Sequence, residues 1–329
     1  MKKHISAALA VLLALALFAG CAVHNNPGSS PISGGESADG DKISIVATIF
    51  PPYDFAREVA GDNAELKMLL PPASESHSFE PTPQDIITVQ NADVFIFVGG
   101  ESDDWVNNVL DSMDTSKMKI VTLMDCVEVV EEEIVEGMQD EEEGTEAEDG
   151  EEETEYDEHV WTSPRNAKLI VQKLSDTFCA VDASNADTYK TNTAAYLAKL
   201  DELDGKFKAA VDGGVRKTLV FGDRFPFRYF ADAYGLDYFA AFPGCSTETE
   251  ASASTVAFLI DKVKAENIPV VFHIELSNAK IADTIAEAAG AKALELHAAH
   301  NISKADFESG VTYLDIMTRN ADALREALD

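Results

Sequence analysis

Residues 92–100 read ADVFIFVGG, and this stretch decides the fold class. Its five central residues, Val94 to Val98, are all apolar, which is typical of a strand that is covered on both faces. The two glycines that follow end the strand. Helices are predicted on either side, over residues 83–91 and 102–110. A buried strand between two helices indicates a parallel sheet with crossover helices.

The same alternation of strands and helices continues in both directions from this stretch. In the first half, strands are predicted at residues 43–48, 66–70 and 119–123, with a helix over 50–60 that opens with FPPY. In the second half, strands at 218–222, 237–241, 270–274 and 293–296 alternate with helices at about 227–234, 252–267, 278–289 and 303–327. We therefore predict an α/β fold with two parallel-sheet lobes of the (βα)4 type. Ligands of such sheets bind in loops at the C-terminal strand ends, which places a cleft between the lobes.

A long helix is predicted between the two lobes. Ser163 and Pro164 supply the N-cap and the first turn of one helix, which reaches about residue 180. A second helix starts at residue 184 or 185 and reaches about residue 211. Its ~27 residues span roughly 40 Å, about the width of two lobes, which indicates a rigid spine. The expected domains are an N-terminal lobe over 42–183, a spine helix over 184–213 and a C-terminal lobe over 214–329.

The first 41 residues carry features of export and membrane anchoring. Lys2 and Lys3 precede an apolar stretch over 5–19, which is too short for a comfortable membrane span and is typical of a signal peptide. Residues 17–21 read LFAGC, which resembles the cleavage site of bacterial lipoproteins. We expect a signal peptide over 1–20, lipidation of Cys21 and a flexible linker over 21–41. The mature protein is then expected outside the cytoplasm, lipid-anchored to the bacterial cell membrane.

Acidic residues dominate the charge of the chain. The formal net charge is −34 at pH 7, and residues 128–158 alone hold eighteen Asp or Glu and no Lys or Arg. Acid at this density repels itself and stays solvated, so a disordered acidic loop is predicted over 128–158. Such a loop concentrates cations in its surroundings, and the overall charge argues against nucleic acid as a partner.

The cysteines do not indicate a metal site. Apart from Cys21 the chain contains Cys126, Cys179 and Cys245, and none of them has CxxC spacing. A thiolate metal site is therefore not expected. An odd number of cysteines outside the cytoplasm leaves at least one free or mismatched, and the pairing cannot be read from the sequence.

Three histidines lie in loops at the expected C-terminal edges of the sheets. His77 is in a polar loop after the strand over 66–70, His159 precedes the helix that begins at 164, and His297 closes the strand over 293–296. Imidazole is the commonest metal ligand, and three or four N and O ligands from separate loops suit Zn²⁺ or Mn²⁺. His24 lies in the linker and His273 lies inside a strand, so neither is a candidate ligand.

Several motifs occur in an order that is typical of one protein family. They read FPPYDF at 50–55, PPASESHSFEPTP at 71–83, ADVFIFVGGE at 92–101, DEHVWTSP at 157–164 and GVTYL at 310–314. Over residues 43–328 the chain resembles the zinc/manganese-type solute-binding lipoproteins of bacterial metal ABC transporters (cluster A-I, high-affinity zinc uptake). The second and fourth motifs resemble the segments that carry the family's first two histidine ligands. The resemblance implies a non-enzymatic, monomeric protein that captures a divalent metal and delivers it to the permease of an ABC importer.

One ligand position departs from the family's pattern. The third ligand of the family, a His or Glu, follows a strand of the second lobe, and here that place reads VFGDRFPF at 220–227. Gly222 has no side chain to offer at the ligand position. Asp223 is the nearest substitute, although Arg224 beside it is able to pair with it. The fourth ligand of the family, an Asp or Glu after the last strand, is replaced by His297.

The resemblance therefore implies a metal site made of three histidines, namely His77, His159 and His297. His300 is an alternative ligand or a residue that supports one, and Glu275 either completes the ligand set or orients a histidine. Three imidazoles favour Zn²⁺, because Mn²⁺ prefers more carboxylate oxygen. If Asp223 and Glu275 bind in place of His297, Mn²⁺ becomes the better prediction.

Other classes of function fit less of the sequence. A zinc hydrolase is disfavoured because neither HExxH nor Gly-x-Ser-x-Gly is present. Cell adhesion at a host or matrix surface is compatible with a surface lipoprotein that also binds metal. A cleft for a metal chelate such as an iron–siderophore fits the fold, but the histidines favour a bare ion. The leading hypothesis is zinc capture for an ABC importer, with manganese as the alternative.

Overall fold

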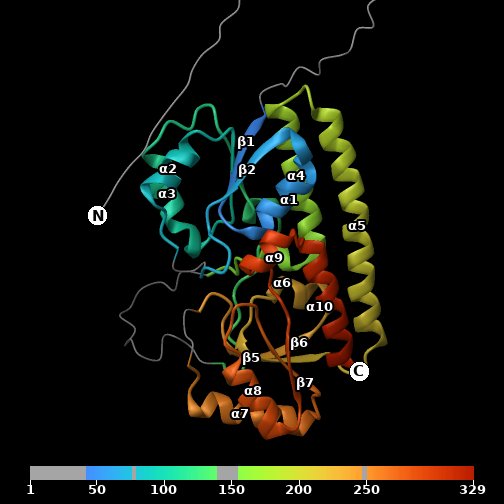
Figure 1. Ribbon diagram of the computed structural model, residues 1–329. Coiled ribbons are helices and arrows are strands. Elements are labelled where there is room, and N and C mark those ends of the chain that lie inside the picture. Colours follow the sequence, from blue (N-terminus) through green and yellow to red (C-terminus); the bar gives the residue numbers. More distant parts are fainter. Residues whose placement is uncertain (1–41, 76–78, 139–154, 247–249) are drawn as a thin grey trace, which may run out of the picture. The chain divides into compact units, whose positions relative to one another are not determined.

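Two four-stranded parallel sheets form the framework of the protein (Figure 1). This computed structural model describes residues 42–75, 79–138, 155–246 and 250–329. The first sheet has the order β2-β1-β3-β4, with β1 at Ile43–Ala47, β2 at Ala64–Met68, β3 at Val94–Phe97 and β4 at Lys119–Thr122. The second has the order β6-β5-β7-β8, with β5 at Thr218–Arg224, β6 at Asp237–Phe242, β7 at Val270–His273 and β8 at Lys292–Glu295. The predicted α/β fold with two parallel sheets is confirmed.

Strand β3 shows why its sequence is continuously apolar. It pairs in parallel with β1 on one side and with β4 on the other, and all four of its residues are buried. Val94 and Ile96 belong to the apolar cluster on one face of the sheet, whereas Phe95 and Phe97 belong to a second cluster on the opposite face. A strand that supplies two cores needs apolar residues at every position.

Three helices connect the strands of the first sheet. They are α1 at Phe50–Ala60, α2 at Pro83–Gln90 and α3 at Asp104–Asp111. Two of them have a proline in the first turn, where the missing amide hydrogen has no helical acceptor to lose. In α2, Thr82 and Asp85 form a capping box that fixes the first turn. The loop between β2 and α2 contains the histidine-bearing motif, and it is anchored at its second end by this cap.

Helix α5 at Ala186–Gly213 occupies the place of the expected spine. It packs against α1 and α4 (Pro164–Val181) of the first half and against α10 (Tyr313–Leu328) of the second half. Figure 1 shows α5 running along one side of both sheets. At 1.5 Å per residue such a helix is about 40 Å long, so a single rigid rod contacts both halves.

Four shorter helices complete the second half before α10. They are α6 at Arg228–Tyr234, α7 at Ala253–Glu266, α8 at Lys280–Ala289 and α9 at Lys304–Ser309. The sequence predicts one helix over 303–327, but the structure divides it into α9 and α10. Gly310 ends α9 with a φ of 77°, and Thr312 starts α10 through a capping box with Asp315. The left-handed glycine ends the first helix, and the new N-cap starts the second.

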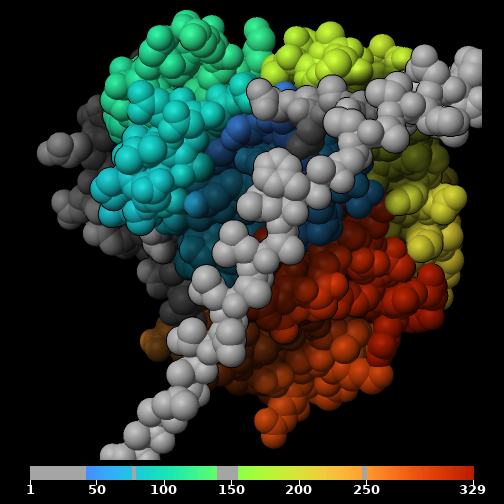
Figure 2. Space-filling view, turned by 45° about the horizontal axis from the view of Figure 1, so that its top comes forward, coloured from blue at the N-terminus to red at the C-terminus, as the bar shows by residue number. Residues whose placement is uncertain are grey.

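The two halves share one apolar core. A single buried cluster includes Ile45 of β1, Phe207 of α5 and Phe221 of β5. The ring of Tyr53 in α1 lies 5.7 Å from that of Phe307 in α9, and the blue and red surfaces of these segments meet in Figure 2. Within the described residues, no helix is both long enough and apolar enough to span a membrane. A shared core resists large rotations of one half against the other.

The acidic run is ordered at both of its ends, which differs from the predicted loop over 128–158. Glu131 and Tyr156 form an antiparallel bridge, and the amide of Asp157 donates to the carbonyl of Val130 at 3.0 Å. Val130 and Val135 also pack against the shared core. Apolar residues within the run therefore hold its ends in place, while residues 139–154 lie outside the described ranges. The thiols of Cys126, Cys179 and Cys245 are unpaired.

Candidate metal centre

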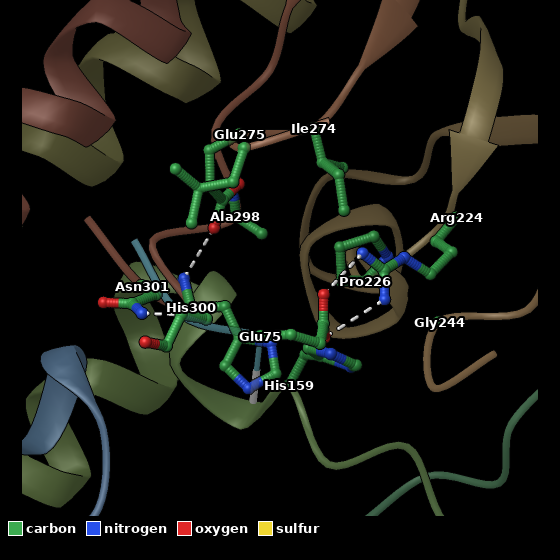
Figure 3. A pocket seen from close by; sticks show the side chains of 12 residues that line it. Glu75, His159, Arg224, Pro226, Gly244, Ile274, Glu275, Ala298, His300 and Asn301 are labelled. Carbon is green, nitrogen blue, oxygen red and sulfur yellow. Dashed lines mark hydrogen bonds and ion pairs between the residues drawn. The ribbon is translucent and has the colours of Figure 1, made fainter. Parts of the chain in front are cut away.

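A small cavity lies where the C-terminal strand ends of the two sheets approach each other. Its volume is about 30 Å³, which is room for an ion and one or two waters. Figure 3 shows its side chains converging from both halves of the chain. The lining residues are Ser74, Glu75, His159, Arg224, Pro226, Gly244, Ile274, Glu275, Leu276, Ala298, His300 and Asn301.

His159 lies at the bottom of this cavity and is fully buried. Oδ1 of Asp157 accepts the backbone amide of His159 at 2.8 Å and lies 3.2 Å from its Nδ1. Because a carboxylate only accepts, Nδ1 carries the proton, and the lone pair that can bind a metal lies on Nε2. A carboxylate behind a histidine is the usual support of a metal-binding imidazole.

The protonation of His159 follows from the same surroundings. Burial lowers the pKa of the imidazole, but the neighbouring carboxylates, Asp157 first, outweigh burial and raise the pKa above its ordinary value of 6.5. A proton therefore competes with a metal for this ring more strongly than it does for an exposed histidine.

His300 is the second imidazole of the cavity. Its ring centroid lies 5.1 Å from that of His159, with the two planes nearly perpendicular, and 5.0 Å from the ring of Trp161. The preceding residue, Ala299, has a φ of 58°, a left-handed conformation that alanine adopts at a cost of about 1 kcal/mol. Two imidazoles from different halves of the chain thus meet in one cavity, and the turn that brings them together is strained.

Glu275 supports the His300 turn through its carboxylate. Oε2 accepts the backbone amide of Ala298 at 2.6 Å, and Oε1 accepts that of His300 at 2.9 Å. The side chain is 7% exposed, so these two bonds form in a place with little water. Of the two roles that the sequence leaves open for Glu275, this geometry supports the orienting one.

His297 does not line the cavity. Its Nδ1 accepts the backbone amide of Ala299 at 2.9 Å and lies 3.4 Å from Oε2 of Glu275. In a neutral imidazole with Nδ1 as acceptor, the proton is on Nε2, and neither nitrogen offers a lone pair to a metal. Asn320 further fixes this residue by accepting its backbone amide at 2.9 Å and donating to its carbonyl at 2.7 Å. His297 is therefore not part of the lining that contains His159 and His300, and its role as a ligand stays a prediction.

Gly222 and Asp223 have structural roles and do not line the cavity. A Cβ at position 222 would lie 2.4 Å from Cα of Ala282, so a residue with a side chain does not fit there. Oδ1 of Asp223 accepts the amide of Arg224 at 2.9 Å, and Oδ2 accepts the amide of Ile274 at 3.3 Å. Asp223 thus joins the end of β5 to that of β7, and both of its oxygens already accept amides.

Arg224 pairs across the cavity. The sequence suggests Asp223 as its partner, but its guanidinium lies 3.4 Å and 3.5 Å from the two carboxylate oxygens of Glu75, and it donates to the carbonyl of Ser246 at 3.2 Å. Figure 3 shows this pair on one wall, beside the two imidazoles. Sequence reasoning missed both roles, although Glu75 stands two residues from His77 in the motif at 71–83.

Two further carboxylates lie close to His159, the half-buried Glu132 and the buried Glu158. Oε1 of Glu132 accepts the amides of Gly244 at 2.8 Å and Cys245 at 3.3 Å, and burial raises its pKa. Burial also raises the pKa of Glu158. Glu132 belongs to the run that the sequence predicts to be disordered, so its contacts with Gly244, which lines the cavity, and with Cys245 could not be predicted.

His77 falls in residues 76–78, outside the described ranges. Ser74 and Glu75, which precede it in the same motif, line the cavity together with His159 and His300. Among the residues that the structure does describe, no three His, Cys, Asp or Glu side chains form a group that could hold a metal. The role of His77 as a ligand stays a prediction.

Comparison with known proteins identifies the family. A family model described as "Zinc-uptake complex component A periplasmic" matches residues 45–327. The chain belongs to this zinc-uptake family. The "High-affinity zinc uptake system protein ZnuA" of Bacillus subtilis (strain 168) is 31% identical to this chain over 301 residues, and the match covers 92% of each chain. The "Zinc-binding lipoprotein AdcA" of Streptococcus pneumoniae is 31% identical over 327 residues, which are 99% of this chain and 61% of that protein.

Two solved structures share this fold. The zinc-bound ZnuA-like domain of Streptococcus pneumoniae AdcA has a TM-score of 0.72 and 29% identity, and the match covers 88% of this chain and 99% of that one. The laminin-binding protein Lmb of Streptococcus agalactiae has a TM-score of 0.72 at 23% identity, over 87% of this chain and 100% of that one. The second comparison shows a likeness of fold alone.

Proposed function

We propose that this member of the zinc-uptake family captures one Zn²⁺ outside the cytoplasm and delivers it to the permease of an ABC importer. The observation that carries the proposal is the meeting of two imidazoles, His159 and His300, in a cavity of ionic size between the two halves. The carboxylate of Asp157 behind His159 adds the support that a zinc-binding histidine requires. The binding of zinc by relatives in this family agrees with the proposal.

The proposed ligands are His77, His159 and an imidazole of the turn over 297–300. The sequence favours His297 for the third place. The geometry supports His300, because His300 lines the cavity whereas Nδ1 of His297 accepts a backbone amide. Three nitrogen ligands and one further ligand, such as water, suit the tetrahedral preference of Zn²⁺.

Zinc is favoured over manganese by the carboxylates around the cavity. Mn²⁺ prefers a larger share of carboxylate oxygen, and Asp223 and Glu275 are the carboxylates that the sequence offers for it. Both oxygens of each accept backbone amides in this structure. Because these oxygens already accept amides, we expect the imidazoles of His159 and His300, which line the cavity, to supply the metal donors.

The proposal also covers the cellular location of the protein and its oligomeric state. Its family is that of a periplasmic component of a zinc-uptake complex. We propose that Cys21 carries a lipid anchor, that residues 21–41 link it to the globular part, and that the protein acts as a monomer. These residues lie outside the described ranges, so the sequence alone supports this part.

Metal retention tests the proposed function directly. Mature protein is loaded with equimolar Zn²⁺ and Mn²⁺, desalted, and analysed for metal content. We expect about one zinc per chain and little manganese, because imidazole donors prefer the borderline ion. Retention of manganese in place of zinc would support the alternative metal, and retention of neither would refute metal capture.

Zinc affinity is expected to fall as the pH drops. A protonated histidine must lose a proton before it can bind zinc. Because the pKa of His159 is raised above 6.5, protons displace the metal as the pH falls below that pKa. His159 alone contributes about a tenfold loss or more between pH 7.5 and 5.5, and further histidine ligands add to it. Competition with a chromophoric chelator at both pH values measures this. Equal affinities would count against histidine ligation.

Arg224 and Glu75 are expected to act in opposite directions on zinc affinity. The guanidinium places a positive charge on the wall of a cation site, and the carboxylate beside it offsets that charge. Arg224→Gln should raise zinc affinity roughly three- to tenfold, and Glu75→Gln should lower it by a similar factor, with both effects reduced at high salt. Isothermal titration measures both.

Arg165→Gln is the matched control, because Arg165 forms a comparable exposed pair with Asp204 and does not line the cavity. Its zinc affinity should equal that of the wild type. If Arg224→Gln and Glu75→Gln change affinity in the same direction, the pair acts as a structural tie, and the electrostatic account is wrong.

A further inference from the structure

Asn301 connects the two walls of the cavity. We propose that it is a positioning residue, which fixes the loop over 71–75 in the first half against the turn over 297–302 in the second half and thereby sets the geometry of the metal pocket. The inference rests on the proposed zinc function and adds to it a residue that does not itself bind the metal.

The side chain of Asn301 makes three hydrogen bonds, and both hydrogens of its amide are donated across the boundary between the halves. Nδ2 donates to the carbonyls of Pro71 at 2.9 Å and Ser74 at 2.7 Å, while Oδ1 accepts the amide of Ile302 at 2.8 Å. The residue is 3% exposed. Since the amide nitrogen faces two carbonyls and the oxygen faces an N–H, only one orientation of the side-chain amide satisfies all three partners.

The loop over 71–75 depends on these bonds for its place. It closes on itself through a bond from the amide of Ser74 to the carbonyl of Pro71 at 3.1 Å, and the amide of Ala73 donates to the carbonyl of Ile302 at 2.8 Å. Ala73 has a φ of 68°, so the loop is held in a conformation that an alanine disfavours. Ser74 and Glu75 then form part of the cavity wall.

The turn over 297–302, to which that loop is bonded, is itself fixed by hydrogen bonds. Glu275 holds it to the end of β7 through the amides of Ala298 and His300. Nε1 of Trp161, two residues after His159, donates to the carbonyl of Ala298 at 2.8 Å. Asn301 thus ties the first-half loop to a turn that is already bonded to the segment of His159, and Figure 3 shows Asn301 next to His300 at the cavity.

Removing the amide of Asn301 is expected to loosen the loop without removing a metal ligand. The carbonyls of Pro71 and Ser74 lose a buried donor, and a loosened wall no longer presents its groups at metal-binding distance. Substitution of residues that support metal ligands typically lowers metal affinity 10- to 100-fold. We expect a loss in that range, smaller than the loss caused by removing a ligand.

The test compares Asn301→Leu with Asn192→Leu in the mature protein. Leucine is close in size to asparagine and adds no charge. Asn192 is the matched control, because its Nδ2 donates to the carbonyl of Val59 at 3.0 Å and so also joins distant segments, but away from the cavity. Amide hydrogen exchange of Ala73 and Ser74 is measured in metal-free protein, and zinc affinity is measured by chelator competition.

Asn301→Leu should speed exchange at Ala73 and Ser74, leave the amide of Leu70 unchanged, and lower zinc affinity about 10- to 100-fold. Asn192→Leu should change neither the exchange at these sites nor the affinity. Unchanged exchange in Asn301→Leu would overturn the inference, as would faster exchange with an unchanged affinity. Should the leucine variant not fold, Asn301→Ser, which can still serve one carbonyl, must show intermediate effects on both quantities.

The two readouts separate this inference from the proposed function. If the wild type binds no zinc, the proposed function fails, and the role in zinc binding fails with it. The exchange data on metal-free protein still decide whether Asn301 orders the loop.

Discussion

Replacing His159 with alanine is expected to lower zinc affinity by roughly 10²- to 10³-fold. Structural zinc sites are worth about 10–16 kcal/mol, so one of four ligands accounts for about 3–4 kcal/mol. His159 is fully buried, and its Nδ1 is held by Asp157, so its position is set before the metal arrives. Chelator competition on the folded variant, with folding checked by circular dichroism, measures the effect.

Two further variants define what the His159 result means. Asp157→Asn keeps the size of the side chain but weakens the support of the ring, and it should cost a smaller factor of about 10 to 100. His273→Ala is the matched control, because His273 is the partly buried histidine of β7 and does not line the cavity. A His159→Ala variant whose affinity matches that of His273→Ala would remove His159 from the site.

His300→Ala and His297→Ala are expected to differ sharply. His300 lines the cavity beside His159, so its removal should lower zinc affinity about 10²-fold or more. His297 accepts the amide of Ala299 and is clamped by Asn320, so its removal should lower the thermal stability of the protein with a much smaller effect on zinc. Affinity and melting temperature of both variants are measured on metal-free and zinc-loaded protein.

The opposite pattern is equally informative. If His297→Ala loses zinc and His300→Ala retains it, the ligand set implied by the family resemblance is right, and the turn must rearrange when the metal binds. If both variants lose zinc equally, each histidine is needed for zinc binding, and the expected difference between them is wrong.

The fold could be predicted because its signals are local. The apolar run at 92–100 and its flanking helices specify a covered parallel strand, and the same alternation recurs in the second half. The break between α9 and α10 was missed, because Gly310 and the cap at Thr312 lie inside an otherwise helical pattern. A glycine and an N-cap two residues apart could have predicted that break.

The sequence predicts which residues lie at the C-terminal ends of the strands, but not which of their side chains face the cavity. His159 lies next to a helix start at such an edge, and the structure places it in the cavity. Which of His297 and His300 faces the cavity depends on the left-handed φ of Ala299, and alanine gives no sequence signal for that conformation. The pairing of Arg224 with Glu75 is a contact between residues 149 positions apart, and no local pattern reveals it.

Anomalous diffraction at the zinc edge, on crystals of the zinc-loaded mature protein, shows directly whether zinc binds between His159 and His300. We expect one strong zinc peak per chain in the cavity, about 2.0–2.1 Å from Nε2 of His159 and from a ring nitrogen of His300. A peak bonded to His297, or one away from His159, would contradict it.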